Sequence, residues 1–276
     1  MRFIIRDAGD LADFLIVVKG QVKVKQQILL FFIRLSVAPL NLFKLEKGGM
    51  DMNKMIQGLV NRVVRIEVSG KIYISGRLIK LGSDTLFLFD GKDYYYMPLV
   101  HIQKMKVDDN DERDIKIPTD PPSIISEYDK DDMSLRKILT KAKGAFVEIY
   151  VTAGKPLHGY ITSIMNNYFV FHSPIYKTMY IAIKHLKWLI PYMNSQPPYG
   201  IENQNFPVPA IHASLARTFE VQIEKFKNQI VIFNVGESNH HVGKINNIEE
   251  QIVELQTARN QLIMINLQHI KTLHFV

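Results

Sequence analysis

The chain has 276 residues, 47% of them hydrophobic, and a formal net charge of +7. This length corresponds to about two domains, or to several small ones. The sequence contains no cysteine, which excludes a disulfide framework and a thiolate zinc site.

The charge is distributed unevenly along the chain. Residues 53–107 carry 9 Lys and Arg against 4 Asp and Glu, residues 133–193 carry 8 against 1, and residues 213–276 carry 6 against 6, whereas residues 108–132 carry 3 against 10. A uniform polyanion-binding surface would make all three of the longer segments basic. We therefore interpret the basic segments as solvated faces that an acidic linker offsets.

Residues 1–51 are an N-terminal extension that we leave out of the fold prediction. Its apolar runs, residues 11–18 and 28–33, are shorter than the roughly 20 residues that span a bilayer. No small-residue cleavage site follows, so no signal peptide is predicted. Residues 46–49 back-translate to a purine-rich, ribosome-binding type of sequence, so one hypothesis is that translation starts at Met52. The alternative is a genuine amphipathic N-terminal arm.

A short sequence recurs three times in the rest of the chain, and each copy begins with a histidine. The histidines are 84 residues apart, and a glycine precedes each at nearly the same distance; the six positions are His101, His185, His269, Gly76, Gly159 and Gly243. A long fixed period indicates one structural unit copied three times. We interpret the histidines as a structural feature of the repeat, suited to bonding a carbonyl at a strand end.

The first repeat, residues 52–107, predicts one helix and five short strands. Apolar residues have helical spacing over 53–61 and alternate with charged residues from Val64 to Val68. Asp90-Gly91 is a hairpin signal. The strands are predicted at 64–68, 76–81, 86–89, 94–97 and 102–107. So small a unit fits a strongly bent barrel, whose closure removes the exposed edges.

The pattern that carries Gly76, Leu78, Asp84 and residues 86–88 resembles the Sm-like barrel. It is also similar to a family of uncharacterised small proteins in spore-forming bacilli. The resemblance covers residues 53–107 best and the other two copies loosely. In an Sm-like RNA chaperone a Lys-His pair of the last hairpin helps to bind uridine-rich RNA. Here Leu99-Val100 precedes His101, so those RNA-binding residues do not carry over.

Residues 108–132 form an acidic linker, in which charge runs and prolines predict an extended connector. Its carboxylates do not have the spacing of a calcium-binding loop. The second repeat, residues 133–193, follows. Ser134 is expected to cap a helix over 135–143, and strands are predicted at 145–151, 159–164, 168–171, 179–183 and 187–190.

The second repeat also suggests an alternative function. Its aromatic residues and lysines could bind single-stranded nucleic acid by stacking and charge, and the candidate residues are Lys137, Lys141, Lys143, Tyr168 and Lys187. The simpler interpretation is that aromatic residues on short strands fill small cores.

A Pro-rich linker, residues 194–212, leads to the third repeat, residues 213–276. A helix is predicted over 214–227, and strands at 229–235, 243–248, 252–256, 262–267 and 270–275. Glu237, His240 and His241 share one loop but lack a fourth ligand, so we predict an exposed polar loop rather than a metal site.

No nucleotide-binding, nucleophile-elbow or zinc-protease motif occurs. We predict a mainly β protein of three tandem small five-stranded Sm-like or SH3-like barrels, each preceded by a short helix. It is expected to be neither an enzyme nor dependent on a cofactor or metal. The predicted role is that of an interaction or structural protein, cytoplasmic or spore-associated, for example in the spore coat. It would act through protein partners or self-assembly and have no integral membrane segment. RNA or single-stranded nucleic-acid binding is the alternative.

Overall fold

The computed structural model describes residues 52–108, 115–116, 133–152, 154–192, 198–200, 214–238 and 240–275. The chain divides into Met1–Met50 and Asp51–Val276, and the described residues belong to the second part. The N-terminal extension lies outside the described residues, as does most of both linkers, so the predictions made for them stay predictions.

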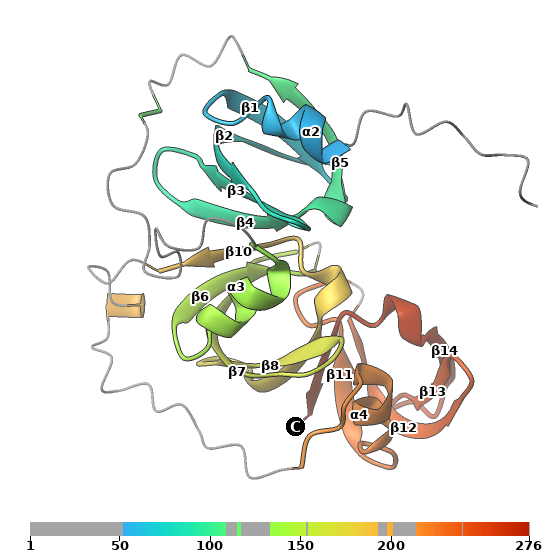
Figure 1. The fold of residues 1–276 in the computed structure, drawn as a ribbon. Helices are drawn as coiled ribbons and strands as arrows, with labels where there is room; N and C mark the ends of the chain where they lie inside the picture. Colours follow the sequence, from blue (N-terminus) through green and yellow to red (C-terminus); the bar gives the residue numbers. More distant parts are fainter. Residues whose placement is uncertain are drawn as a thin grey trace, which may run out of the picture. The chain divides into compact units, whose positions relative to one another are not determined.

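Three segments of the chain share one series of elements, a short helix followed by five strands (Figure 1). Unit 1 contains α2 (Met52–Gln57), β1 (Val63–Val68), β2 (Ile72–Leu81), β3 (Thr85–Phe89), β4 (Tyr94–Pro98) and β5 (Ile102–Val107). Unit 2 contains α3 (Leu135–Lys141), β6 (Phe146–Tyr150), β7 (Leu157–Ile164), β8 (Tyr168–Ser173), β9 (Lys177–Ala182) and β10 (Trp188–Pro191). Unit 3 contains α4 (Phe219–Glu224), β11 (Ile230–Phe233), β12 (His241–Glu249), β13 (Ile252–Gln256), β14 (Leu262–Asn266) and β15 (Thr272–Phe275).

A 3-10 turn separates the fourth and fifth strands of every unit. These turns are η1 (Leu99–His101), η2 (Ile183–His185) and η5 (Leu267–His269), and each ends at a repeat histidine. A further 3-10 turn, η3 (Pro198–Gly200), lies between units 2 and 3. The period seen in the sequence therefore corresponds to a repeated series of structural elements.

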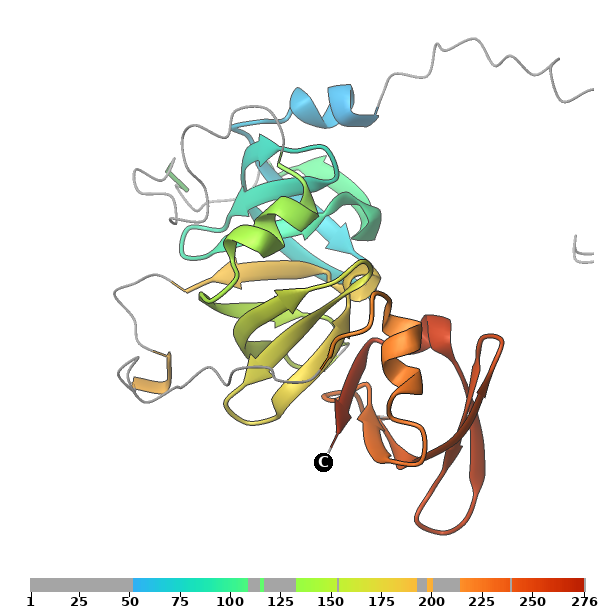
Figure 2. The same cartoon turned by 60° about the horizontal axis from the view of Figure 1, so that its bottom comes forward.

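All the described strands belong to one open antiparallel sheet, in the order β14-β13-β12-β11-β15-β9-β8-β7-β6-β10-β4-β3-β2-β1-β5. Within each unit the fifth strand lies beside the first, and the first to fourth follow in sequence. Neighbouring units join where the fourth strand of one pairs with the fifth strand of the next. Figure 2 shows the second junction, where the dark red β15 lies beside the yellow β9.

The two junctions have the same register. Leu189 faces Tyr96 at the first junction, and Leu273 faces Tyr180 at the second. Each leucine lies four positions after a repeat histidine, and each tyrosine lies five positions before one. The first junction has one such pair and the second has three. Pro98 explains the difference, because it replaces Ala182, whose amide donates to the Lys271 carbonyl at 3.0 Å, and proline has no N–H.

The mainly β fold class is confirmed, whereas closed tandem barrels are not. Among the described strands, the fourth and fifth strands of a unit do not pair with each other, and β4 and β9 pair with the following unit instead. Several predicted elements differ in length from the observed ones, among them the helix predicted over 53–61 and the strand predicted over 76–81, which are α2 and β2. The largest difference is in the helix predicted over 214–227, which is only α4, because Thr218 is extended (φ −123°, ψ 158°) and caps the helix at Val221 N. No helix in the described part of the chain has the length and hydropathy to cross a bilayer.

The three repeat glycines lie on the second strand of their units, where that strand crosses the third. A Cβ atom would lie 2.6 Å from the Phe89 carbonyl oxygen at Gly76, 2.2 Å from that of His172 at Gly159, and 2.5 Å from that of Gln256 at Gly243. A break in register follows within a few residues in all three strands. Glycine thus permits the close approach at which the strand bends.

Replacing Gly159 with alanine is expected to lower the free energy of unfolding by about 3 kcal/mol, because the added methyl group must displace backbone. Urea denaturation measures the change. Gly58→Ala is the control, since its Cβ would meet only the Met55 carbonyl oxygen, at 3.5 Å, and a change within about 0.5 kcal/mol is expected. Equal effects of the two substitutions would contradict this role of the repeat glycine.

The hydrophobic cores cross the unit boundaries. The core of unit 1 includes three residues of unit 2, Tyr150, Trp188 and Ile190. The core of unit 2 includes residues of unit 1, among them Phe87 and Tyr96. Because apolar burial is the main stabilising contribution, the units hold each other together through shared side chains as well as shared strands.

Candidate interaction site

The repeat histidines lie at the junctions between units. His185 Nε2 is 2.9 Å from the carbonyl oxygen of Gln268, which belongs to unit 3. The acceptor is a carbonyl of the 3-10 turn η5, so this hydrogen bond reaches into the following unit. The Nδ1 atom of His101 is 3.2 Å from Ser69 Oγ. The Lys184 carbonyl of unit 2, which is equivalent to that of Gln268, favours the charged form of His101.

Burial decides the charge state of these two rings. It lowers the pKa of His185 to about 4, and the neighbouring cations Lys184 and Lys271 act in the same direction. Burial also lowers the pKa of His101. At neutral pH both rings are therefore uncharged. His185 then carries its proton on Nε2, because only an N–H can donate to the Gln268 carbonyl.

The third histidine has no following unit within the chain, and His269 is exposed. The other half of this contact is the carbonyl acceptor. At the opposite end of the array, in unit 1, this acceptor has no preceding unit to supply a histidine. Val100, which occupies the position of Lys184 and Gln268, is 81% exposed. The full hydrogen bond is thus formed at the second junction, whereas at the first junction His101 Nε2 is buried without a hydrogen-bond partner among the described residues. Each end of the array has one half of the contact.

A polar side chain of each preceding unit caps the helix of the next. Asp84 Oδ1 accepts a hydrogen bond from Leu135 N at 2.7 Å, and Asn167 Oδ1 accepts one from Phe219 N at 2.8 Å. Both acceptors lie eight residues after a repeat glycine, and both satisfy an amide at a helix start that has no partner within its helix. Asp84 was part of the sequence pattern, but the motif alone did not show this role.

Apolar residues complete the junctions, and their equivalents in unit 3 are exposed. Tyr168 and Tyr180 are 0% and 3% exposed between units 2 and 3, whereas Ile252 and Met264, which occupy the same positions in unit 3, are 39% and 60% exposed. Leu262, at the start of β14, is 56% exposed. The outer face of unit 3 is therefore an uncovered copy of a surface that is buried inside the chain.

The opposite end of the array, at β5, is charged. A groove along β1, β2 and β5 is lined by Arg65, Glu67, Tyr73, Lys104 and Lys106. The guanidinium of Arg65 lies over the Tyr73 ring, 5.2 Å from its centroid. The two ends of the sheet thus differ in character: the end at β14 is mostly apolar, and the end at β5 is basic.

The residues proposed for nucleic-acid binding do not form one surface of stacked rings and lysines. Lys137, Lys141 and Lys143 are exposed on and just after α3. Tyr168 is fully buried, and its hydroxyl donates to the Ala216 carbonyl at 2.8 Å, with Gln222 Oε1 as a second, more distant acceptor at 3.1 Å. Lys187 is 9% exposed and lies over the Tyr150 ring, 5.5 Å from its centroid. Tyr168 therefore offers no ring face to a base in this fold.

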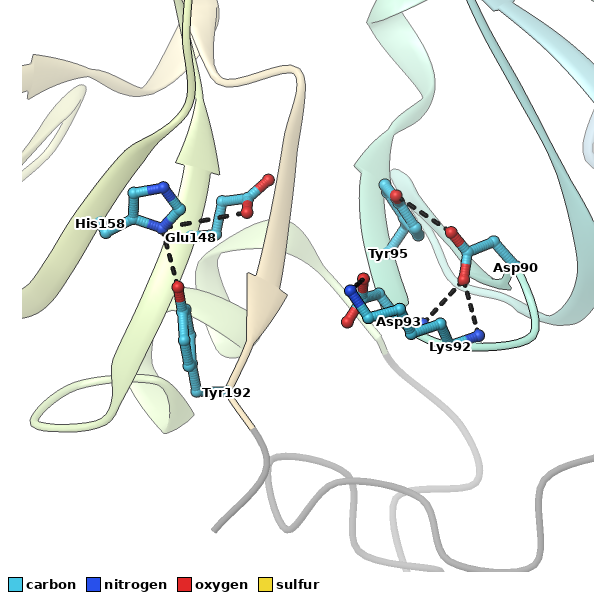
Figure 3. Close-up of polar contacts among 7 residues, drawn as sticks. All are labelled: Asp90, Lys92, Asp93, Tyr95, Glu148, His158 and Tyr192. Carbon is cyan, nitrogen blue, oxygen red and sulfur yellow. Dashed lines mark hydrogen bonds and ion pairs between the residues drawn. The ribbon is translucent and has the colours of Figure 1, made fainter. Parts of the chain in front are cut away.

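A group of ionisable side chains lies at the first junction (Figure 3). On the unit 1 side, Asp90 Oδ1 accepts hydrogen bonds from the amides of Lys92 and Asp93 at 2.8 and 2.7 Å, and Oδ2 accepts one from the Tyr95 hydroxyl at 3.2 Å. Burial, followed by the charge of Asp90, raises the pKa of Tyr95. Asp90 therefore has a structural role in the turn between β3 and β4.

The unit 2 side of this group contains Glu148, His158 and Tyr192 (Figure 3). The Tyr192 hydroxyl is 3.0 Å from His158 Nδ1, and Glu148 Oε2 is 3.9 Å from the same nitrogen. Burial, followed by the charge of Asp93, raises the pKa of Glu148. A catalytic relay places the reacting hydroxyl and the orienting carboxylate on opposite ring nitrogens. This geometry therefore differs from that of a relay.

In the loop considered for a metal, Glu237 forms an ion pair with Lys271. His240 is exposed, and its Nδ1 lies 3.2 Å from the Glu237 carbonyl oxygen. Among the residues that the structure describes, no three His, Asp or Glu side chains are placed to hold a metal ion.

Two comparisons with known proteins show the family to which the chain belongs. A family model described as the YwrJ third domain matches residues 218–273, which lie in unit 3. The "Uncharacterized protein YwrJ" of Bacillus subtilis (strain 168) is 38% identical over 224 residues, which cover 80% of this chain and 99% of the relative. The chain belongs to the YwrJ family. The predicted resemblance to an uncharacterised family of bacilli is confirmed, and the Sm-like barrel is not.

Proposed function

We propose that the protein is a non-enzymatic interaction or structural protein that binds protein partners through the two open edges of its sheet. One observation carries the proposal: both internal junctions are strand pairings in one register, and the strands at the ends of the array, β5 and β14, each have a single neighbour in the described sheet. An edge strand is a template for another chain, and strand addition is a common mode of protein recognition.

Each unit within this proposal is of the Sm-like kind. The repeated short helix, the five strands in one order and the bend glycine support that assignment. The sequence resemblance to proteins of spore-forming bacilli makes the sporulating cell the place to look for a partner, in the cytoplasm or in the spore, including its coat. A non-enzymatic role is supported by the group around His158, where both neighbours approach one ring nitrogen.

The alternative function, nucleic-acid binding, retains one supporting observation: the groove beside β5 contains three cations and Tyr73. An affinity of the full chain for single-stranded RNA that falls steeply with salt would favour this alternative. The uncovered apolar face of unit 3 favours a protein partner, since large exposed apolar patches mark interaction sites.

Site-specific photo-crosslinking in the cell that makes the protein tests the proposal. A photoreactive residue replaces Lys106 at one edge or Met264 at the other, and Lys141 on the exposed side of α3 is the control position. The proposal predicts protein adducts from both edge positions and few from position 141, with mass spectrometry identifying the joined peptides. An absence of adducts at both edges would contradict it.

A further inference from the structure

We infer that the partner at both edges is a second copy of this chain, bound head to tail, with β14 of one copy paired to β5 of the next. The inference rests on the proposed function, because it names the partner of the same two edges. It follows from continuity with junctions that the chain already contains, in which the fourth strand of one unit pairs with the fifth strand of the next.

The internal junctions specify the register between copies. In both of them, the residue five positions before a repeat histidine faces the residue four positions after the next one. The equivalent residues at the open edges are Met264, five before His269, and Met105, four after His101. Met264 of one copy would therefore face Met105 of the other, and Ile263 would face Lys106.

The histidine contact continues in the same way. His185 reaches the carbonyl of the residue just before the next repeat histidine. The equivalent acceptor for His269 is the carbonyl of Val100 in the second copy. His269 and Val100 are both exposed, as two halves of an unmade contact would be. The amide of Asn266, at the position of Ala182, would donate to the Gln103 carbonyl, as Ala182 does to Lys271.

The side chains at the two ends are compatible with this junction. Unit 3 presents exposed Ile252, Leu262 and Met264 beside Glu254, whereas the groove of unit 1 contains three cations and one carboxylate. In this register Met264 meets Met105 on one face of the joined sheet, whereas Lys106 and Lys104 face Ile263 and Ile265 on the other face. Lysine stems cover apolar surface while their ammonium groups remain in water, so the two lysine stems can lie over these isoleucines.

A head-to-tail contact generates a closed ring or an open filament, depending on the rotation between copies. A closed ring leaves no edge strand, which removes the hazard that open edges present. Two copies are the smallest ring that pairs both edges of every copy, and the same junction would then occur at every boundary between units.

Disulfide formation between introduced cysteines can be tested on the purified full chain without competing thiols, because the chain has no cysteine of its own. The Ala182–Lys271 pair is hydrogen-bonded, so the pair three residues further along, Met179 and His274, is of the closer, non-hydrogen-bonded kind. Its equivalent between copies joins Ile263 to Lys106. The variant Lys106→Cys/Ile263→Cys should therefore form intermolecular disulfides, detected in a mixture of isotope-labelled and unlabelled protein.

The matched control is Lys106→Cys/Leu262→Cys, because Leu262 is more exposed but points to the opposite side of β14. We expect the first variant to form the intermolecular bond about ten-fold faster than the control, since disulfides need a close, aligned pair of Cβ atoms. His269→Ala should weaken the association about five-fold, and His240→Ala should leave it unchanged. Equal disulfide rates in the two variants would overturn the inference. Photo-adducts to a different protein at positions 106 and 264 would then still support edge binding.

Discussion

Replacing Tyr168 with alanine is expected to lower the free energy of unfolding by about 4 kcal/mol, the range found for large aromatic residues removed from cores. The ring is fully buried between units 2 and 3, against Phe219 at 5.8 Å between ring centroids, and its hydroxyl donates to the Ala216 carbonyl at 2.8 Å. Thermal or urea unfolding measures the loss. If the junction weakens more than the units, unit 3 will unfold in an earlier, separate transition.

Two further variants distinguish the contribution of the Tyr168 hydroxyl from that of its ring, and a buried tyrosine from an exposed one. Tyr168→Phe keeps the ring and removes the donor to the Ala216 carbonyl, so a loss of about 1–2 kcal/mol is expected. Tyr73→Ala is the exposed control, because Tyr73 is 54% exposed, and should change stability by less than about 1 kcal/mol. A Tyr168→Ala variant as stable as the parent protein would contradict the buried position of this ring.

Acidification from pH 7 to pH 4 is expected to destabilise the second junction through His185. The unfolded chain takes up a proton near the ordinary pKa of 6.5, whereas the folded chain does so at about 4. Between these values the unfolded state binds more protons, so stability is present above pH 6.5 and falls as the pH falls. The contribution of this one ring is at most about 3 kcal/mol.

The difference between the parent chain and His185→Gln isolates that contribution. Glutamine can still donate to the Gln268 carbonyl but does not titrate, so its unfolding free energy should fall less steeply between pH 6.5 and pH 4. A residual slope is expected from His101 and His158, whose pKa values burial also lowers. His240→Gln, at an exposed position, should match the parent chain. A parent chain with no excess slope over His185→Gln would show that His185 is not buried at a junction.

The sequence predicted the local features of the fold well, because alternation of apolar residues and turn residues act over a few positions. The strand predicted at 102–107 is β5, and the hairpin predicted from Asp90-Gly91 joins β3 to β4. The repeat glycines carried a further signal, since a residue without Cβ at the same place in three copies indicates a close backbone approach, which the structure shows.

Features that depend on distant pairing could not be derived from the sequence. The continuation of one sheet through three units needs the register of Tyr96 with Leu189, residues 93 positions apart. The burial of Tyr168 depends on Ala216 and Gln222, which follow the second linker. Without that neighbour, an aromatic residue among lysines was compatible with a stacking surface. The repeat histidines were recognised in the sequence. The hydrogen bond from His185 to the following unit could not be predicted, because each repeat was considered alone.

The molar mass of the purified full chain, measured by light scattering over a wide range of concentrations at low salt, tests the central claim most directly. A single chain has a mass of 31.9 kDa. The account predicts a mass that rises with concentration towards a whole multiple of this value. In His269→Ala the same rise in mass should occur only at higher concentrations. A mass of one chain at every concentration and at low salt would contradict the claim that β5 and β14 are complementary halves of one junction.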